Sequence, residues 1–494
     1  MFFALSGGGL RRAAAGWLAI ASIFFYGYWS PRYVLLLIAS IVANFAAGRL
    51  IDALRQAGSA DRARVALIAA IGANLGVLGY YKYANFFVDT LNAAAGTGLS
   101  LGEIVLPIGI SFFTFTQIAY LVDTHVGKVR ERGFVPYALF VTFYPHLIAG
   151  PVLHHAEMMP QFARDSTYGF RLDNFLIGVG YFSIGLFKKV VLADGIQPFV
   201  GPVFEPDPGY QLTLVEAWGG VLAYTLQLYF DFSGYSDMAI GLSKMLNVDL
   251  PFNFDSPYKA RNISEFWRRW HMTLSRFLRD YLYIPLGGNR FGSFRRYVNL
   301  LTTMLLGGLW HGAGWTFVIW GALHGAYLVV HQLWQSAWER WAPDARLPWP
   351  RVGHALSVLL TFLCVVVAWV FFRATTLDSA LHVLSAMAGL NGFVLPTEMK
   401  PALEGLPGSS WVSGYGVLQA SGGFRQVAWI AVLLAIAWWM PNSQAIIAAL
   451  SQRVRDWRTE RPSWALLGAG AVGVFLLAAI NGSHGSSEFI YFNF

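Results

Sequence analysis

Several stretches of this sequence contain almost no charged residues and are long enough to cross a lipid bilayer as helices. They are Trp17 to Tyr28 continuing through Val34 to Ala47, then Val352 to Phe372 and Trp464 to Ile480. A helix needs roughly 20 apolar residues to cross the hydrocarbon core. Strands of a spanning barrel are shorter and alternate apolar with polar residues, so these continuous blocks predict helices.

Charge and cysteine content exclude other classes of protein. Only 13% of the 494 residues are Asp, Glu, Lys or Arg, against about 25% in soluble domains. We therefore predict an all-α polytopic integral membrane protein. The single cysteine, Cys364, forms no intrachain disulfide. No phosphate-binding loop, dinucleotide fingerprint or Cys/His metal array is present, so we expect no metal and no nucleic acid, and assign the net charge of +8 to the membrane surface.

Basic residues between the apolar blocks predict the topology. They form four clusters: Arg49, Arg55, Arg62 and Arg64; Lys128, Arg130 and Arg132; Arg340, Arg346 and Arg351; and Arg453, Arg455, Arg458 and Arg461. The positive-inside rule makes these loops cytoplasmic. Residues 391–423 contain one base, Lys400, and are predicted to be an extracytoplasmic loop. A single apolar block follows the last basic cluster, which predicts an extracytoplasmic C-terminus and a cytoplasmic N-terminus.

The segment 256–296 is the largest predicted cytoplasmic segment and is strongly basic. Within it, Ile263 to Leu278 places aromatic and basic residues at roughly helical spacing, with Asn262 or Ser264 available as a helix cap. One interpretation is an interfacial helix whose Trp and Phe side chains lie at headgroup level. The other is a docking surface for a polyanionic cosubstrate, because arginine binds phosphate through a bidentate fork.

One histidine is predicted to lie deep in the membrane. Leu300 to Val330 reads as a helical hairpin that turns at Gly312 to Gly314. At 1.5 Å per residue, His324 is on the order of 15 Å from that turn, near mid-bilayer. An ionisable residue there is a functional-site hypothesis by default. The alternative is a plain hydrogen bond between helices. By contrast, His154 and His155 lack enough neighbouring ligands for a metal site.

Five motifs resemble a known family. They are, in order, Pro145 to Pro151 (PHLIAGP), Asp231 to Gly241 (DFSGYSDMAIG), Phe266 to Ser275 (FWRRWHMTLS), Trp310 to Gly312 (WHG) and Trp320 to Gly325 (WGALHG). The chain is similar to the membrane-bound O-acyltransferases, in particular the bacterial branch that contains the alginate O-acetylation membrane protein. The teichoic acid D-alanylation transporter is a more distant relative. The resemblance implies transmembrane, re-entrant and interfacial helices around a central tunnel.

The resemblance also implies an organisation and a set of site residues. It implies one transmembrane domain over 1–494, with N-terminal helices at 1–132, a catalytic core at 133–372 and C-terminal helices at 373–494. By position, His324 matches the catalytic histidine and His271 the second essential histidine. The residues expected to bind the donor or line the tunnel are Asn262, Trp267, Arg268, His311, Asp231 and Ser233. No cofactor is implied, because the donor, acetyl-CoA, is a substrate.

The expected chemistry suits these residues. Transfer of an acyl group from a thioester to an alcohol needs a base for the hydroxyl proton, and imidazole serves this purpose at neutral pH. The sequence ends Phe489 to Phe494 (FIYFNF), which resembles a terminal motif of this branch in which the tyrosine is proposed as a transient acyl carrier. Tyr491 is therefore a candidate carrier. The alternative is an aromatic belt that anchors the last helix at the interface.

These observations predict an inner-membrane O-acetyltransferase for an exopolysaccharide such as alginate. Acetyl would pass from cytoplasmic acetyl-CoA to a periplasmic or membrane-anchored esterase-like acetyltransferase, so that the polysaccharide is an indirect partner. The alternatives are a D-alanyl or other acyl transferase of the same family, a polysaccharide or lipid exporter with a histidine proton relay, and a scaffold without catalysis. No residue identifies the acceptor polymer.

Overall fold

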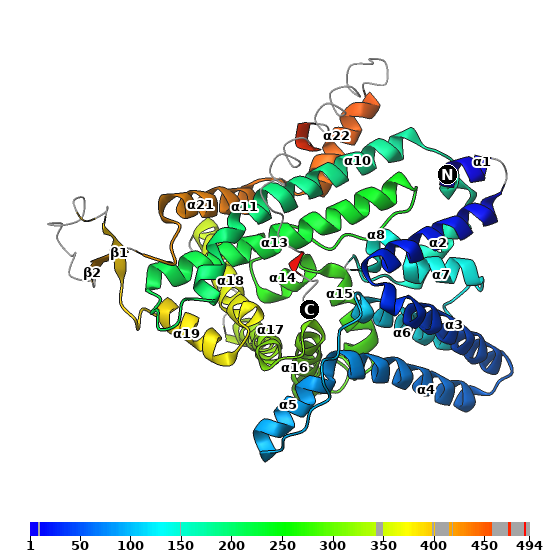
Figure 1. Ribbon diagram of the computed structural model, residues 1–494, viewed down its shortest axis with the longest axis horizontal. Coiled ribbons are helices and arrows are strands. Elements are labelled where there is room, and N and C mark those ends of the chain that lie inside the picture. The colour runs from blue at the N-terminus through cyan, green and yellow to red at the C-terminus, as the bar shows by residue number, and fades with distance from the viewer. Residues whose placement is uncertain are drawn as a thin grey trace. The chain divides into compact units, whose positions relative to one another are not determined.

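The computed structural model describes residues 1–7, 10–148, 150–341, 349–397, 400, 414–416, 418–456, 473–475 and 489–490. Most of these residues lie in helices (Figure 1), which confirms the predicted all-α class. The chain divides into two compact units that interleave in sequence. The first contains residues 1–184, 235–253 and 449–471, and the second contains residues 185–234, 254–448 and 472–494.

The first unit is a set of helices from the N-terminal part of the chain. They are α1 (Phe2–Gly7), α2 (Arg11–Trp29), α3 (Val34–Gln56), α4 (Ala60–Leu78), α5 (Ala84–Ala95), α6 (Ile110–Val126), α7 (Phe134–Thr142), α8 (Tyr144–Leu147) and α9 (His155–Ala163). Short turns η1 (Pro31–Tyr33), η2 (Gly79–Tyr83) and η3 (Asp165–Thr167) connect some of them. Two longer helices, α10 (Leu172–Phe187) and α13 (Leu214–Met245), contribute residues to both units.

The second unit contains the remaining elements. Its helices are α11 (Asp194–Ile196), α12 (Gly201–Phe204), α14 (Ile263–Arg269), α15 (Met272–Leu278), α16 (Gly292–His311), α17 (Trp315–Trp341), α18 (Pro350–Arg373), α19 (Leu377–Met387), α21 (Gly423–Trp439) and the start of α22 (Ser443–Asp456). Its shorter turns are η4 (Lys188–Ala193), η5 (Gln197–Phe199), η6 (Pro257–Lys259) and η7 (Arg279–Tyr283). Strands β1 (Val394–Pro396) and β2 (Gly414–Gly416) form a short parallel pair within the loop predicted at 391–423.

Several helical stretches have the length and composition of membrane spans. Within the described residues, four qualify: Pro31–Gln56, Ala60–Ala95, Leu172–Phe204 and Pro350–Arg373. Helices α21 and α22 qualify together as a fifth, bent by 58° at the break between them. The predicted span at Trp464 to Ile480 lies outside the described residues, apart from the helical residues 473–475.

Polar contacts join the helices of the first unit. Asn44 of α3 and Asn74 of α4 exchange hydrogen bonds of 3.1 and 2.6 Å through their side-chain amides. Such reciprocal amide pairs link helices in a solvent that offers no water. At another point, Asp52 forms ion pairs of 3.0 Å with both Arg55 and Arg132. Two of the basic clusters assigned to the same membrane side therefore meet at one carboxylate.

Glycines determine the packing of the hairpin formed by α16 and α17, which lie side by side in Figure 1. A Cβ atom on Gly308 would collide with the carbonyl oxygen of Phe317, and one on Gly321 with that of Met304. One on Gly325 would lie 2.8 Å from the Leu301 side chain. Gly321 and Gly325 form a small-xxx-small pattern, which allows two helix backbones to approach closely. The hairpin predicted from the sequence is confirmed.

We expect Gly321→Ala to destabilise this hairpin. The added methyl group has no room against α16, and overpacking of this kind costs about 1–3 kcal/mol. Gly72→Ala in α4 is the matched control, because a Cβ there meets no atom within 4 Å, and alanine is the better helix former by about 1 kcal/mol. The midpoint of thermal unfolding in detergent should fall for the first variant only. If the two variants unfold at the same midpoint, the close approach of α16 and α17 at Gly321 does not contribute to stability.

The interpretation of Ile263 to Leu278 as one interfacial helix differs from the structure in two respects. The segment is broken into α14 and α15 at Trp270 and His271, where the φ of His271 is 43°. Its large apolar side chains do not lie at a headgroup surface, because Trp270 is 1% exposed and Phe277 is 5% exposed. The aromatic spacing reflects burial inside the protein instead.

Candidate active site

Helix α17 holds His324 within a group of aromatic side chains. The imidazole has no exposed surface. Five aromatic rings surround it, at the following centroid distances: Trp320 at 4.7 Å, Trp267 at 5.2 Å, Tyr327 at 5.9 Å, Phe266 at 6.0 Å and Trp369 at 6.1 Å. Contact between His324 and a substrate therefore requires that part of this group moves. The tunnel predicted to reach His324 stays a prediction.

Several buried polar atoms at and around His324 form no hydrogen bond with the described residues. Neither ring nitrogen of His324 forms a hydrogen bond within the part of the chain that the structure describes. The same holds for the indole nitrogens of Trp267 and Trp320. Buried polar groups in folded proteins are almost always hydrogen-bonded, so a cluster of such exceptions calls for an explanation. A carbonyl or hydroxyl group of a substrate would satisfy an imidazole nitrogen and an indole N–H together.

His271 is placed by an unusual backbone conformation. It lies between α14 and α15 in the left-handed region, with φ 43° and ψ 52°. This conformation is uncommon for a residue with a side chain, and such residues concentrate at functional sites. The imidazole is fully buried, and its ring lies 4.8 Å from that of Phe232 on α13.

His311 connects the two predicted catalytic histidines. It is the last residue of α16 and is 3% exposed. Its ring lies 6.4 Å from that of His271 and 5.0 Å from that of Trp320, which in turn contacts His324. The structure therefore brings His271, His311 and His324 into one aromatic cluster, with His311 and Trp320 between the outer two.

Asn262, one of the two caps that the sequence offered, is the helix cap in the structure. Its side-chain oxygen accepts a hydrogen bond of 2.8 Å from the backbone N–H of Glu265, three residues into α14. The Glu265 carboxylate reaches back to accept from the backbone N–H of Arg261 at 2.9 Å. This arrangement resembles a capping box and fixes where α14 begins. Asn262 therefore positions the helix that carries Trp267 and Arg268.

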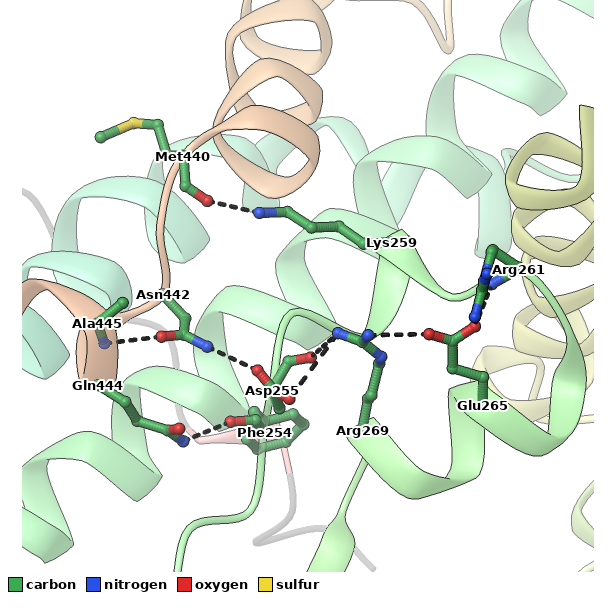
Figure 2. A network of polar contacts seen from close by, with 10 residues as sticks. All are labelled: Phe254, Asp255, Lys259, Arg261, Glu265, Arg269, Met440, Asn442, Gln444 and Ala445. Carbon is green, nitrogen blue, oxygen red and sulfur yellow. Dashed lines mark hydrogen bonds and ion pairs between the residues drawn. The ribbon is translucent and has the colours of Figure 1, made fainter. Parts of the chain in front are cut away.

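Figure 2 shows a polar network that links α14, through the loop that precedes it, to the break between α21 and α22. Arg269 donates to Glu265 at 2.8 Å and to the backbone oxygen of Asp255 at 3.2 Å. Asn442 donates to the Asp255 carboxylate at 2.8 Å, and Gln444 donates to the backbone oxygen of Phe254, also at 2.8 Å. The bend in the α21 and α22 pair is thereby tied to the loop that precedes α14.

Six of the eight arginines of the basic segment fall into two groups. Arg261, Arg269 and Arg279 form ion pairs with neighbouring carboxylates. Burial raises the pKa of Glu265, but hydrogen bonds from Arg261 and Arg269 outweigh this effect and hold the pKa below its ordinary value.

The second group consists of Arg268, Arg290 and Arg295. All three are exposed, and none has a carboxylate partner among the described residues. These arginines remain available to bind an anion.

Two predicted site residues lie on α13. Asp231 is 1% exposed, and its carboxylate is 2.8 Å from the Lys189 ammonium. Ser233 is 2% exposed. Their assignment to the donor path stays a prediction. Tyr491 lies outside the described residues, although its neighbours Phe489 and Ile490 are described.

Sequence reasoning missed Trp320, Phe266 and Trp369 as parts of the site. For Trp320 a signal was present, since it lies four residues before His324 and so shares its helix face. Sequence reasoning also missed the partner of His155, which forms a hydrogen bond of 2.9 Å with Asp123. Within the described part of the chain, no group of three His, Cys, Asp or Glu side chains is arranged to bind a metal.

Comparison with known proteins gives a consistent result. The model of the membrane-bound O-acyltransferase family matches residues 110–372, which include all five motifs and both predicted catalytic histidines. A peptidoglycan O-acetyltransferase of Helicobacter pylori is 41% identical over 97% of this chain and 91% of its own length. The probable alginate O-acetylase AlgI of Pseudomonas aeruginosa is 43% identical over 83% of this chain and 76% of its own length.

A more distant match is the teichoic acid D-alanyltransferase of Streptococcus thermophilus, which is 27% identical over 54% of this chain and 68% of its own length. All three relatives are named for acyl transfer: acetyl in the peptidoglycan and alginate enzymes, and D-alanyl in the teichoic acid enzyme. Together with the apolar helices described above, these matches establish a multi-pass membrane acyltransferase. The chain therefore belongs to the membrane-bound O-acyltransferase family.

Proposed function

We propose that the chain takes acetyl from cytoplasmic acetyl-CoA and passes it across the inner membrane for O-acetylation of an extracytoplasmic polysaccharide. The observation that carries this proposal is the buried His324, with two ring nitrogens that no described residue engages, among indole N–H groups that also lack acceptors. An imidazole in this situation can take a proton from a hydroxyl, while an adjacent N–H can stabilise the oxygen of the attacked carbonyl.

The proposed reaction balances without a cofactor. His324 removes the proton from an acceptor hydroxyl, and the oxygen attacks the carbonyl carbon of the thioester. The carbon–sulfur bond breaks, the acetyl ester forms, and CoA leaves as the thiol after it receives the proton. His271 is assigned to orient the donor or polarise its carbonyl, which is consistent with its place in the same aromatic cluster.

The exposed arginines are assigned to donor capture. CoA carries phosphates, which arginine binds through paired N–H groups. Arg268 follows Trp267, one of the residues in contact with His324. A phosphate held by Arg268 would therefore be near α14, the helix that reaches the buried site. We assign this face to the cytoplasm, the N-terminus to the same side and the C-terminus to the periplasm, following the predicted topology.

The acceptor is proposed to be a cell-surface glycan, reached through a periplasmic or membrane-anchored esterase-like acetyltransferase. An alginate-like exopolysaccharide is the first candidate. Peptidoglycan is the second, because the relative named for peptidoglycan aligns with 97% of this chain, against 83% for the alginate relative from Pseudomonas aeruginosa. The longer alignment with the peptidoglycan relative includes more of the residues outside the range 110–372 that matches the family model.

Inside-out membrane vesicles that contain the chain test the proposal. We expect them to consume labelled acetyl-CoA and to deliver the label to the lumen, which corresponds to the periplasm. Vesicles without the chain are the control. In cells, alkali-labile acetyl should then be measured separately on exopolysaccharide and on peptidoglycan, which identifies the acceptor. A chain that leaves acetyl-CoA untouched but moves intact polysaccharide would be an exporter, and the proposal would be wrong.

A further inference from the structure

The C-terminal segment, residues 489–490, is attached to α13 by a specific contact. The backbone N–H of Ile490 donates a hydrogen bond of 3.0 Å to the side-chain Oδ2 of Asp231, on α13. The two residues are 259 positions apart in the sequence. Phe489, the residue before, is 5% exposed and its ring lies 6.1 Å from that of Phe232. Residues 489–490 are therefore docked against the middle of α13, within the second unit.

Asp231 is suited to this contact because of its charged surroundings. Its other oxygen, Oδ1, lies 2.8 Å from the Lys189 ammonium, and Lys189 is also 2.8 Å from a carboxylate oxygen of Asp194. Two carboxylates thus share one ammonium, which leaves an oxygen of Asp231 to accept from a backbone N–H. Hydrogen bonds to ionised acceptors are roughly twice as strong as neutral ones.

Two members of this group, Lys189 and Asp194, lie within a candidate membrane span, which argues for a function. Lys189 lies in the π-helical turn η4, within the candidate span Leu172–Phe204. Its side chain is 13% exposed, and those of Asp194 and Asp231 are 10% and 1% exposed. Ionisable residues at such positions are expensive and are usually retained for a function. Single π-helical turns also occur frequently at functional sites.

The helix packing is built to bring the two parts together. A Cβ atom on Gly234 would lie 2.7 Å from the backbone oxygen of Gly185 and 3.0 Å from the backbone nitrogen of Lys189. Glycine at 234 therefore permits the close approach of α13 to the end of α10. That approach places Asp231, one turn earlier on α13, beside Lys189.

The docked residues are also close to the histidine cluster. Phe232 contacts the ring of Phe489 on one side, and its ring is 4.8 Å from that of His271. One aromatic ring thus connects the C-terminal segment with a predicted catalytic residue. We propose that Asp231, supported by Lys189 and Asp194, is a positioning residue that holds the C-terminal segment at the histidine cluster through the N–H of Ile490.

The functional consequence of this inference rests on the proposed function, because residues 489–490 immediately precede Tyr491 in the sequence. Asp231 therefore acts by fixing residues 489–490 near the histidine cluster. Its contacts with Lys189 and Ile490 support this role rather than direct contact with the donor.

The first experiment measures whether the segment is held, independently of activity. Cys364 is the only cysteine, so a Cys364→Ala, Ile490→Cys protein carries one thiol and keeps the backbone N–H at 490. Its rate of labelling by a small maleimide is measured in detergent. The same rate is measured for this protein with Asp231→Asn added, which keeps an oxygen acceptor, and with Asp231→Leu added, which has none. Lys189 keeps Asp194 as its partner in both variants.

We expect Asp231→Leu to be labelled at least about tenfold faster than the parent, the factor that corresponds to loss of a hydrogen bond to a charged group. Asp231→Asn should be labelled at a rate close to that of the parent. Equal rates for Leu and Asn at position 231, whether fast or slow, would overturn the inference. Gel filtration establishes that each variant is folded before labelling.

The second experiment removes the donor instead of the acceptor. Proline has no N–H, so Ile490→Pro should lower acetyl transfer to polymer about tenfold or more, while Ile490→Val keeps the N–H and is the control. In an Asp231→Leu background, Ile490→Pro should cause little further loss. Additive losses would contradict a shared contact. If the parent protein does not use acetyl-CoA at all, the proposed function fails, but the labelling result still decides whether Asp231 holds the segment.

Discussion

His324→Ala is expected to reduce acetyl transfer by a factor of about 10²–10⁴, the usual contribution of a general base. The protein should still fold, although removal of an imidazole from a packed aromatic group leaves a cavity. The measurement is alkali-labile acetyl on the polymer in cells, normalised to the amount of chain in the membrane. Loss of the base should lower the rate of transfer without abolishing the binding of acetyl-CoA.

Two further variants make this prediction specific. His324→Gln keeps a hydrogen-bonding side chain of similar size but cannot accept the proton as a base, so it should be as inactive as alanine. His331→Ala is the matched control, because His331 lies two turns later on α17 and is partly exposed. An active glutamine variant would mean that His324 only links helices through a hydrogen bond. Undiminished acetylation with alanine would end the catalytic assignment.

Tyr491→Phe is expected to abolish delivery of acetyl to the polymer. The change keeps the aromatic ring, which is sufficient for an anchor at the membrane interface, and removes only the oxygen that would carry the acyl group. Acetyl content should therefore fall to the level of cells that lack the chain. Labelled acetyl-CoA should also leave no label on the purified variant, whereas the parent protein should acquire label on Tyr491.

The control for this prediction is the same substitution, tyrosine to phenylalanine, at another position in the chain. Tyr415 lies on β2, in the loop predicted to be on the same side of the membrane, and Tyr415→Phe should leave acetylation unchanged. If Tyr491→Phe retains normal acetylation, the carrier role is wrong and the terminal aromatic residues serve as an anchor. The attachment of Ile490 to Asp231 is tested separately and does not depend on this result.

Local patterns in the sequence predicted much of this fold. The hairpin of α16 and α17 followed from two apolar runs and a Gly312 to Gly314 turn, and residue type limited the cap of α14 to Asn262 or Ser264, of which the structure uses Asn262. Both depend on interactions among residues that are close in the sequence. The break at His271 did not follow, because the spacing of Ile263 to Leu278 is compatible with one helix. Only tertiary burial of the aromatic side chains explains why the chain turns there.

Sequence motifs supplied the candidate residues of the site, but not the contacts between them. His324, His271 and His311 were identified from motifs, and the structure brings them into one cluster. The rings of Phe266 and Trp369 come from other helices, so no periodicity could have placed them around His324. The contact of Asp231 with Ile490 joins positions 259 residues apart. Pairings of that kind depend on the complete fold.

The aromatic surroundings of His324 have a consequence for the fate of the proton that it is proposed to accept. No carboxylate is hydrogen-bonded to this imidazole within the described residues. In serine proteases an aspartate stabilises the imidazolium, and here a cation would lack such a counter-ion and would be out of contact with water. An unpaired buried charge is costly. We therefore infer that the imidazolium is short-lived, and that protonation of the departing sulfur occurs nearly in concert with ester formation.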